Sequence, residues 1–317
     1  MRYIVVGAGA VGGTIGARLH QGGHDVLLVA RGAHYEALRR DGLRLITPES
    51  DETLDIPAAD GPVPTRDDDV LILATKSQDT IAALDPWPRD LPVVCAQNGV
   101  ANERMVLRRF ERVYGMCVWL PAQHLEPGVV VAPGHPYSGM LHVGRYPQGV
   151  DDLGHRIVTD LGKRGLVARA APDVMRWKYG KLLGNLANAV DALVGRAPGA
   201  SEVAERARAE ARTVLERAGI AYSTPEEEAE VRGHKVDARP IEGVERGGGS
   251  SWQSLARASG SIEADYLNGE IVLLGREHGV PTPVNEVLRS EADRFAKEKR
   301  PPGSMPLETL LSLIGNP

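Results

Sequence analysis

The chain contains little cysteine and no residue pattern typical of a metal site. Its only cysteines are Cys95 and Cys117, and two cysteines provide neither a disulfide framework nor a zinc-binding pattern. The nine histidines have no metal-ligand spacing either, so we expect no metal. A protein without a disulfide framework fits a reducing compartment, and we expect a cytoplasmic location.

Long apolar runs and a strong positive charge are also absent. No run approaches the ~18 apolar residues of a membrane span, and the N-terminal residues show no basic region or cleavage site of a signal peptide. The net charge of −5 argues against a surface for nucleic acid or anionic membranes. We therefore expect neither as a partner. A length of 317 residues is long for one core and predicts two domains.

Lysine is scarce, since only seven of the 37 basic residues are lysines. An arginine side chain does not release its proton in a protein, whereas a lysine can. Where arginine is so strongly preferred, each lysine inside an apolar element is a candidate for proton chemistry.

The first half of the chain alternates strands with helices. Segments 43–46 and 53–56 are expected to pair, and segments 128–132 and 140–143 are expected to form a hairpin across a turn-rich stretch. The other predicted strands are 4–6, 26–30, 70–75, 93–96, 112–119 and 166–169, and the predicted helices are 33–40 and 151–164. This alternation predicts a mostly parallel, doubly wound sheet.

From Pro172 onward the pattern is helical, without strands between the helices. The predicted helices are 173–194, 201–218, 261–278 and 283–300. The acidic run 226–228 is expected to be a solvated helix start, and 246–250 a flexible loop, either a linker or a substrate-side loop. The predicted fold class is α/β, with a Rossmann-type domain at 1–171 and an all-helical substrate domain at 172–317.

A glycine motif follows the first predicted strand. Gly7, Gly9 and Gly12 match G-x-G-x-x-G, with Ala10 and Val11 between the last two. In dinucleotide-binding proteins the first glycine permits a tight turn, the second admits a pyrophosphate, and the third allows close helix packing. The free N–H groups of that helix N-terminus then face the phosphates. These five residues are therefore predicted to bind a dinucleotide.

The second predicted strand ends at Arg31. NAD-binding units usually carry an acidic residue near this point for the ribose 2′-hydroxyl, whereas an arginine suits a 2′-phosphate. We therefore expect NADP(H) rather than NAD(H). The alternative is a turn-rich loop with a solvated arginine.

Lys76 and Asn98 stand just past two predicted strands. Open α/β sheets bind ligands outside the carboxyl ends of their strands, so both residues are candidates to contact cofactor or substrate. The alternative is ordinary polar residues at strand ends.

Lys181, Asn185 and Asn188 share one face of a predicted helix, because ~100° per residue places Asn185 ~40° to one side of Lys181 and Asn188 ~20° to the other. Lys178 falls on that side too, and Gly184 could admit a close neighbour. A stripe of donors on an apolar helix is costly to bury unless something polar meets it. The alternative is an ordinary exposed face.

A third stretch contains Ser250, Ser251 and Trp252, followed by Glu263 and the residues up to 269. Taken alone, this stretch fits a capped helix with Ser261 as the N-cap and Glu263 in the first turn.

Together these pieces resemble the ketopantoate reductase family, the 2-dehydropantoate 2-reductases, along nearly the whole chain. The Gln-Asn-Gly and Glu-x-Asp-Tyr-Leu-Asn-Gly elements are the most telling, because Lys-x-x-x-Asn also occurs in related β-hydroxyacid dehydrogenases. The matching elements are the glycine motif with Arg31, Lys76, and segments 97–99, 181–185, 250–251, 263–269 and 278–285.

The resemblance implies reduction of 2-dehydropantoate by NADPH to D-pantoate, on the route to pantothenate. It implies that Lys181 is the general acid and that Glu263 helps hold it. It also implies that Asn98, Asn185 and Ser251 contact the substrate, with Lys76 on the cofactor side. This assignment agrees with the chemistry, because an ammonium can stabilise and protonate the developing alkoxide.

One position departs from the family pattern, which often has a second Asn eight residues after the lysine. Here that position is Ala189, and Asn188 could take over the substrate contact. The departure leaves open a reductase of another 2-oxo acid or an imine. A non-catalytic NADP-binding sensor is a further alternative, although it would not need Lys181, Asn185 or Glu263. The sequence leaves a homodimer open.

Overall fold

The computed structural model describes residues 1–244 and 247–315, and its backbone divides into two compact units. Among the described residues, unit 1 comprises 1–98, 102–177 and 224–244, and unit 2 comprises 99–101, 178–223 and 247–315. The predicted domain boundary between residues 171 and 172 stays a prediction. Among the described residues, no helix is both long and apolar enough to cross a membrane.

Unit 1 is built on an eight-stranded sheet with the order β12-β11-β8-β7-β6-β1-β2-β5. Neighbouring strands are parallel except β8 and β11, which pair antiparallel. The strands are β1 Arg2–Val6, β2 Asp25–Val29, β5 Ala58–Ala59, β6 Asp69–Leu73, β7 Val93–Cys95, β8 Val113–Trp119, β11 Gly139–Arg145 and β12 Leu166–Ala170. The predicted doubly wound sheet is therefore confirmed.

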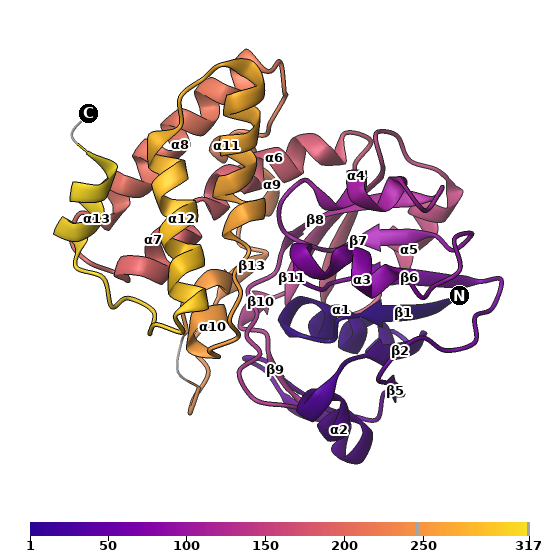
Figure 1. The fold of residues 1–317 in the computed structure, drawn as a ribbon. Coiled ribbons are helices and arrows are strands. Elements are labelled where there is room, and N and C mark those ends of the chain that lie inside the picture. The colour runs from indigo at the N-terminus through magenta and orange to yellow at the C-terminus, as the bar shows by residue number, and fades with distance from the viewer. Residues whose placement is uncertain (245–246, 316–317) are drawn as a thin grey trace. The chain divides into compact units, whose positions relative to one another are not determined.

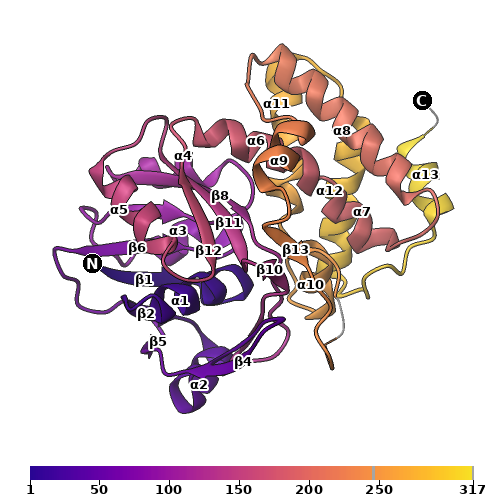
Figure 2. The same cartoon turned by 180° about the vertical axis from the view of Figure 1, so that it is seen from behind.

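Helices cover both faces of this sheet, because alternate residues of each strand point to opposite faces. Tyr3 and Val5 of β1 belong to the core that includes residues of α1 and α5, whereas Ile4 and Val6 belong to the core that includes residues of α3 and α4. The helices are α1 Ala10–Gln21, α2 Gly32–Asp41, α3 Thr80–Leu84, α4 Asn102–Leu107 and α5 Asp152–Leu161 (Figures 1 and 2). Strands covered on both faces are typically apolar runs, as here.

The predicted hairpin of 128–132 with 140–143 is wrong. β9 (Val129–Val131) pairs in parallel with β3 (Leu43–Ile46), while β11 lies in the large sheet. The turn-rich residues between them contain β10 (Gly134–Pro136), whose partner is β13 (Val236–Ala238). A short apolar strand can pair with any available edge, so its partner is chosen by the tertiary structure rather than by the adjacent turn.

The expected pairing of the two segments after α2 is confirmed, since β3 pairs antiparallel with β4 (Asp51–Leu54). The expectation of a strandless second half is wrong at β13. That strand follows α9 (Pro225–Arg232), whose acidic first turn was correctly expected. The helix begins with a capping box between Thr224 and Glu227.

Unit 2 is helical. Its longest helix, α8, buries Val203, Ala207, Ala211 and Val214 completely, at the three- and four-residue spacing of one helix face. The other elements are α7 Ala187–Val194, α10 Ser250–Ala256, the 3₁₀ turn η2 Ala264–Tyr266, α11 Asn268–His278, α12 Pro283–Lys297 and α13 Leu307–Ile314, and α8 is Ala200–Arg217 (Figure 1). The helix α6 Val174–Asn185 contains the division between the units.

Two buried asparagines join the helices of unit 2. Asn285 Nδ2 donates to Ala207 O at 2.9 Å and to Glu210 Oε2 at 2.8 Å. Asn268 Nδ2 donates to Asn285 Oδ1 at 3.0 Å and to Leu186 O at 3.3 Å. Two of the segments that carried the family resemblance thus contribute asparagines that connect α8, α11 and α12.

Three details differ from the sequence predictions. The helix expected over 173–194 is divided at Leu186 into α6 and α7. The helix expected from residue 261 begins at Asn268, after η2, so Ser261 is not its N-cap. The helix α13, which follows the expected stop at 301–303, was not predicted.

Candidate dinucleotide-binding and active-site residues

The glycine turn between β1 and α1 has the geometry that the motif predicts. Gly7 has φ +100°, and a Cβ on it would lie 2.8 Å from Thr75 N. A Cβ on Gly12 would lie 2.1 Å from Gly7 O. Both positions therefore require glycine, the first for its conformation and the second for the close approach of α1 to the turn.

Gly9 serves a different purpose. Among the described residues beyond its chain neighbours, the atom nearest to a Cβ there would be His124 Cδ2, at 3.9 Å. The backbone conformation and the protein's own packing thus leave Gly9 open, as expected where a ligand approaches the chain. Gly9 is the N-cap of α1, so the N–H groups of Ala10 and Val11 belong to the helix N-terminus.

The G-x-G-x-x-G motif does not include two further closely packed glycines of α1. A Cβ on Gly16 would lie 2.6 Å from Leu28 Cδ2 of β2, and one on Gly13 would lie 2.8 Å from Val130 Cγ2 of β9. The spacing of four residues from Gly12 to Gly16 was a usable signal, because it places both on one helix face. These glycines bring α1 close to β2 and β9.

Arg31 is the N-cap residue of α2, with φ −130° and ψ 157°, just past the end of β2. Its side chain is exposed, and among the described residues it forms no hydrogen bond or ion pair. The glycine turn is fastened to the same strand end, because Gly7 N and Ala8 N both donate to Val29 O, at 3.0 and 3.2 Å. A cation and the glycine turn therefore lie at one edge of the sheet.

Lys76 and Asn98 follow β6 and β7 as expected, and both are half-buried. A buried network that the sequence did not reveal connects their loops. Gln97 Nε2 donates to Thr80 Oγ1 at 2.8 Å, and Thr80 Oγ1 donates to Asn102 Oδ1 at 2.7 Å. Asn102 Nδ2 in turn donates to Ser77 Oγ at 3.0 Å and to Asn98 O at 3.2 Å.

This network contains side chains from both strand-end loops and from α3 and α4. Buried polar side chains that hydrogen-bond to one another hold their segments in one arrangement. The network therefore fixes the backbone next to Lys76 and at Asn98.

In unit 2, Lys181 and Asn185 are half-buried on α6, one turn apart. The Asn185 Nδ2 atom is buried and, among the described residues, has no hydrogen-bond partner. A buried donor of this kind is costly unless a ligand or water meets it. Gly184 is exposed, and among the described residues none would lie within 4 Å of a Cβ there, so the structure shows no close protein neighbour at this position.

Asn188 lies beyond the division at Leu186, on α7. Its Nδ2 donates to Ser250 Oγ at 3.4 Å. Asp191, one turn further on, accepts a bond from Gly249 N at 3.0 Å. Sequence reasoning missed Asp191, since an acid on a helix gives no local sign of a partner far along the chain. Ser251, in the first turn of α10, is buried, and Arg246 of the expected loop lies outside the described residues.

Glu263 is half-buried and precedes η2 as its N-cap residue. Gly99 lies against the same turn, because a Cβ on Gly99, whose φ is +75°, would lie 2.8 Å from Tyr266 O. The Gln-Asn-Gly and Glu-x-Asp-Tyr-Leu-Asn-Gly elements thus contact each other through Gly99 and Tyr266, which both belong to unit 2. Gly99 cannot be replaced without strain.

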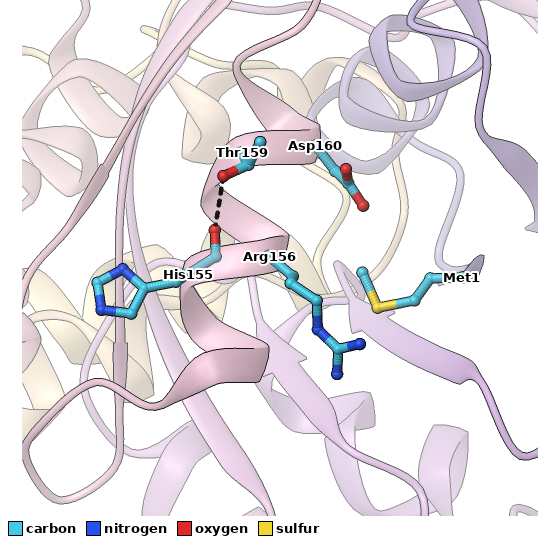
Figure 3. A pocket seen from close by; sticks show the side chains of 5 residues that line it. All are labelled: Met1, His155, Arg156, Thr159 and Asp160. Carbon is cyan, nitrogen blue, oxygen red and sulfur yellow. Dashed lines mark hydrogen bonds between the residues drawn. The ribbon is translucent and has the colours of Figure 1, made fainter.

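A separate depression in unit 1 is lined by Met1 and by four residues of α5 (Figure 3). Met1 precedes β1, so this depression lies at the amino end of that strand, whereas the glycine turn follows its carboxyl end. Ligands of open α/β sheets bind at the carboxyl ends. The depression is therefore not the candidate site.

The glycine turn, the doubly wound sheet and the helical unit define an α/β protein of the Rossmann type. The chain belongs to the ketopantoate reductase PanE/ApbA family, a family of oxidoreductases. The family model described as "Ketopantoate reductase PanE/ApbA" matches residues 3–148, and the one described as its C terminal matches residues 173–294. The family predicted from the sequence is thereby confirmed.

Individual proteins similar to this chain support the same family. The 2-dehydropantoate 2-reductase of Archaeoglobus fulgidus is 30% identical over 297 residues, covering 90% of this chain and 95% of the relative. That of Pyrococcus horikoshii is 29% identical over 303 residues, covering 91% and 95%.

Solved structures share the fold. A PanE/ApbA family ketopantoate reductase from Ralstonia eutropha JMP134 superposes with a TM-score of 0.78 at 26% identity, covering 95% of this chain and 100% of that one. A D-mandelate dehydrogenase in a ternary structure with NADH and anilino(oxo)acetate has a TM-score of 0.80 at 23% identity, with coverages of 95% and 100%. At 23% identity, the similarity to the D-mandelate dehydrogenase shows the fold alone.

Proposed function

We propose that this protein reduces the ketone of 2-dehydropantoate with NADPH, giving D-pantoate for pantothenate formation. The observation that carries the proposal is the pair Lys181 and Asn185 on α6, with a buried Asn185 donor that no described residue satisfies. A ketone oxygen or a carboxylate would satisfy such a donor. The membership in the ketopantoate reductase family supports the choice of substrate.

The cofactor part of the proposal rests on unit 1. Gly9 is open to a ligand, the N-terminus of α1 follows it directly, and Arg31 stands exposed at the end of the neighbouring strand. Backbone N–H groups at a helix N-terminus suit a pyrophosphate, and a guanidinium suits the 2′-phosphate of NADP(H). The candidate cofactor residues are Gly7, Gly9, Ala10, Val11, Gly12, Arg31, Lys76 and Asn98.

The reduction needs a hydride on carbon and a proton on oxygen. The reduced nicotinamide supplies the hydride when bound. In the proposal the Lys181 ammonium donates to the carbonyl oxygen, stabilises the charge that develops there as the C=O π bond breaks, and transfers its proton to the alkoxide. Glu263 holds the Lys181 side chain in place. A neutral amine remains on Lys181 and regains a proton from solvent.

Substrate orientation is assigned to amide and hydroxyl donors. Asn98, Asn185, Asn188 and Ser251 are proposed to hold the carboxylate and the hydroxyl of the substrate. Correct alignment of reacting atoms contributes several kcal/mol to lowering a barrier. A homodimer and a cytoplasmic location are part of the same proposal, and sedimentation of the pure protein tests the former.

A second candidate is a reductase of another 2-oxo acid or an imine. The observation that favours it is Ala189, a buried residue without a donor, at the position where the family often has an Asn. The hydrogen bond from Asn188 Nδ2 to Ser250 Oγ also favours the second candidate, because it occupies the amide that would replace the family's Asn.

The deciding experiment is NADPH oxidation, followed at 340 nm, against a panel of 2-oxo acids and cyclic imines that includes 2-dehydropantoate. The highest kcat/KM for 2-dehydropantoate is the expected result. A higher value for another member of the panel would select the second candidate.

A further inference from the structure

One imidazole in unit 1 joins three segments that are far apart in the sequence. The His34 ring lies in the first turn of α2, and its Nε2 lies 2.8 Å from Ala8 O. Its Nδ1 accepts a bond from Gly128 N at 2.9 Å. Ala8 lies between Gly7 and Gly9 of the glycine turn, and Gly128 comes directly before β9.

These two bonds require one form of the ring. A carbonyl oxygen can only accept, so Nε2 must carry the proton, and a backbone N–H can only donate, so Nδ1 must be unprotonated. His34 is therefore neutral, in the Nε2–H tautomer. Its burial also lowers the pKa of the imidazole from its ordinary value.

The position of this ring relates it to the cofactor residues. His34 is three residues after Arg31 in the same helical turn, and it bonds to the carbonyl that precedes Gly9. The ring of His124 lies 4.2 Å from the His34 ring, centroid to centroid. His124 is also the residue nearest to a Cβ on Gly9.

We infer that His34 is a positioning residue of the dinucleotide site, which locks the glycine turn to the first turn of α2. The inference rests on the proposed cofactor site. Through this bond the phosphate-binding turn and the residue expected to read the 2′-phosphate keep one relative position. Loss of the bond frees the turn at Ala8, so the cofactor must order it on binding and binds more weakly.

The inference also has a pH consequence. A protonated His34 would present an N–H to the Gly128 N–H and break that link, so cofactor affinity falls at acidic pH. The groups around the ring are the Ala8 and Gly128 backbones, the titratable His124 and, earlier in its own helix, Arg31. His124 Nδ1 is itself 3.0 Å from Val129 O.

The test compares three variants with the wild type by calorimetric titration of the full chain with NADPH and with NADH. His34→Leu loses both bonds, and its Kd for each cofactor is expected to rise about 10-fold. Both cofactors should lose affinity, because both contain the pyrophosphate, and NADPH should lose at least as much as NADH, because its 2′-phosphate is assigned to Arg31. In His34→Gln the side-chain amide can still reach Ala8 O, so most of the affinity should return. His34→Asn, which is shorter and can accept only from Gly128 N, should remain weak.

Steady-state kinetics separate positioning from catalysis. With saturating NADPH, kcat of each variant should stay within about 2-fold of the wild type while the cofactor KM rises. The matched control is His155→Gln, at an exposed histidine of α5, which should change nothing.

The pH arm uses NAD⁺, since it has no 2′-phosphate to titrate. Its Kd should rise as the pH is lowered below the ordinary pKa of histidine in the wild type and in His124→Phe, but not in His34→Gln. An unchanged Kd in His34→Leu, or an effect on NADPH alone, would overturn the inference while leaving the cofactor assignment intact. Failure of the wild type to bind either cofactor would instead reject the proposed function.

Discussion

The backbone N–H of Gly249 donates a hydrogen bond to the Asp191 carboxylate at 3.0 Å, across 58 positions of sequence. Asn188, one turn earlier on α7, donates to Ser250 at 3.4 Å. One face of α7 therefore holds the residues on either side of the start of α10. Ser251, the proposed substrate contact, is the next residue along that helix.

This relationship predicts the effect of two substitutions on α7. Asp191→Ala should raise the KM for the oxo acid several-fold, about 1 kcal/mol for one lost bond, because the chain before Ser251 is no longer held. Asn188→Ala should raise the same KM by a similar factor. The cofactor KM should not move in either variant, as steady-state kinetics on the pure variants will show.

Glu202→Ala, at an exposed acid in the first turn of α8, is the control for a general loss of negative charge. If the NADPH KM shifted and the oxo-acid KM stayed constant, the assignment of this helix face to the substrate would be wrong.

Arg31→Ala should erode the preference for NADPH over NADH. Arg31 is exposed and, among the described residues, unpaired, so its guanidinium is available to a 2′-phosphate. A charge-assisted hydrogen bond is worth about 1.5–3 kcal/mol, which corresponds to roughly 10- to 150-fold in the Kd for NADPH with little change for NADH. Direct binding titrations measure both constants.

The control on the same helix is Arg39→Ala, whose guanidinium lies 3.3 Å from Glu36. Equal affinity of the wild type for the two cofactors would reject the assignment of Arg31.

Lys181→Ala should lower kcat by about 10²–10⁴ while the Kd for NADPH stays nearly constant, because a positioned general acid contributes that much. Lys181→Arg should recover little of the rate, since an arginine keeps the charge but does not release the proton. Single-turnover kinetics with saturating NADPH isolate the chemical step.

Two other lysines serve as comparisons. Lys297→Ala removes an exposed lysine of α12 that is paired with Asp293 at 2.9 Å and should leave kcat unchanged. Lys178→Ala tests a lysine on the same helix that is buried. Retention of turnover in Lys181→Ala with its loss in Lys178→Ala would show that the acid is Lys178.

The buried ring of His142 should make the free energy of unfolding depend on pH, independently of catalysis. Its ring lies in edge contact with Trp119 and Trp177, at 4.9 and 4.8 Å between centroids. Among the described residues, neither ring nitrogen has a hydrogen-bond partner. Burial, with the nearby Arg169 charge, lowers the pKa of His142 from 6.5 to about 4.

Because the folded pKa is below the unfolded one, the fold favours the neutral ring. Its contribution is fully present above pH 6.5 and is lost as the pH falls from 6.5 toward 4. A shift of this size corresponds to about 3 kcal/mol in the free energy of unfolding. His142→Phe should therefore lose less stability than the wild type between pH 7 and pH 4, measured by urea unfolding. Parallel curves for the two proteins would show that His142 does not titrate on unfolding in this range.

Local sequence was sufficient for the elements whose signals lie within a few residues. The run Ile4 to Val6 and the glycines after it predicted a buried strand and its turn, because a β-branched run and a positive φ leave a direct mark on the sequence. The four-residue periodicity of α8 was equally clear. The partner of β9 was not, since its three valines are compatible with any apolar edge.

Residue types and their spacing were enough to predict the doubly wound unit, the helical unit, the family and the candidate residues. The hydrogen-bond partners of His34, Asp191 and Asn102 could not be predicted in this way and are set by the folded chain. Each of these side chains bonds to groups that are distant in sequence, and hydrogen bonds depend on proximity in space rather than on order along the chain. The glycine turn and the start of α10 are thus built by local sequence but held in position by residues that no local pattern indicates.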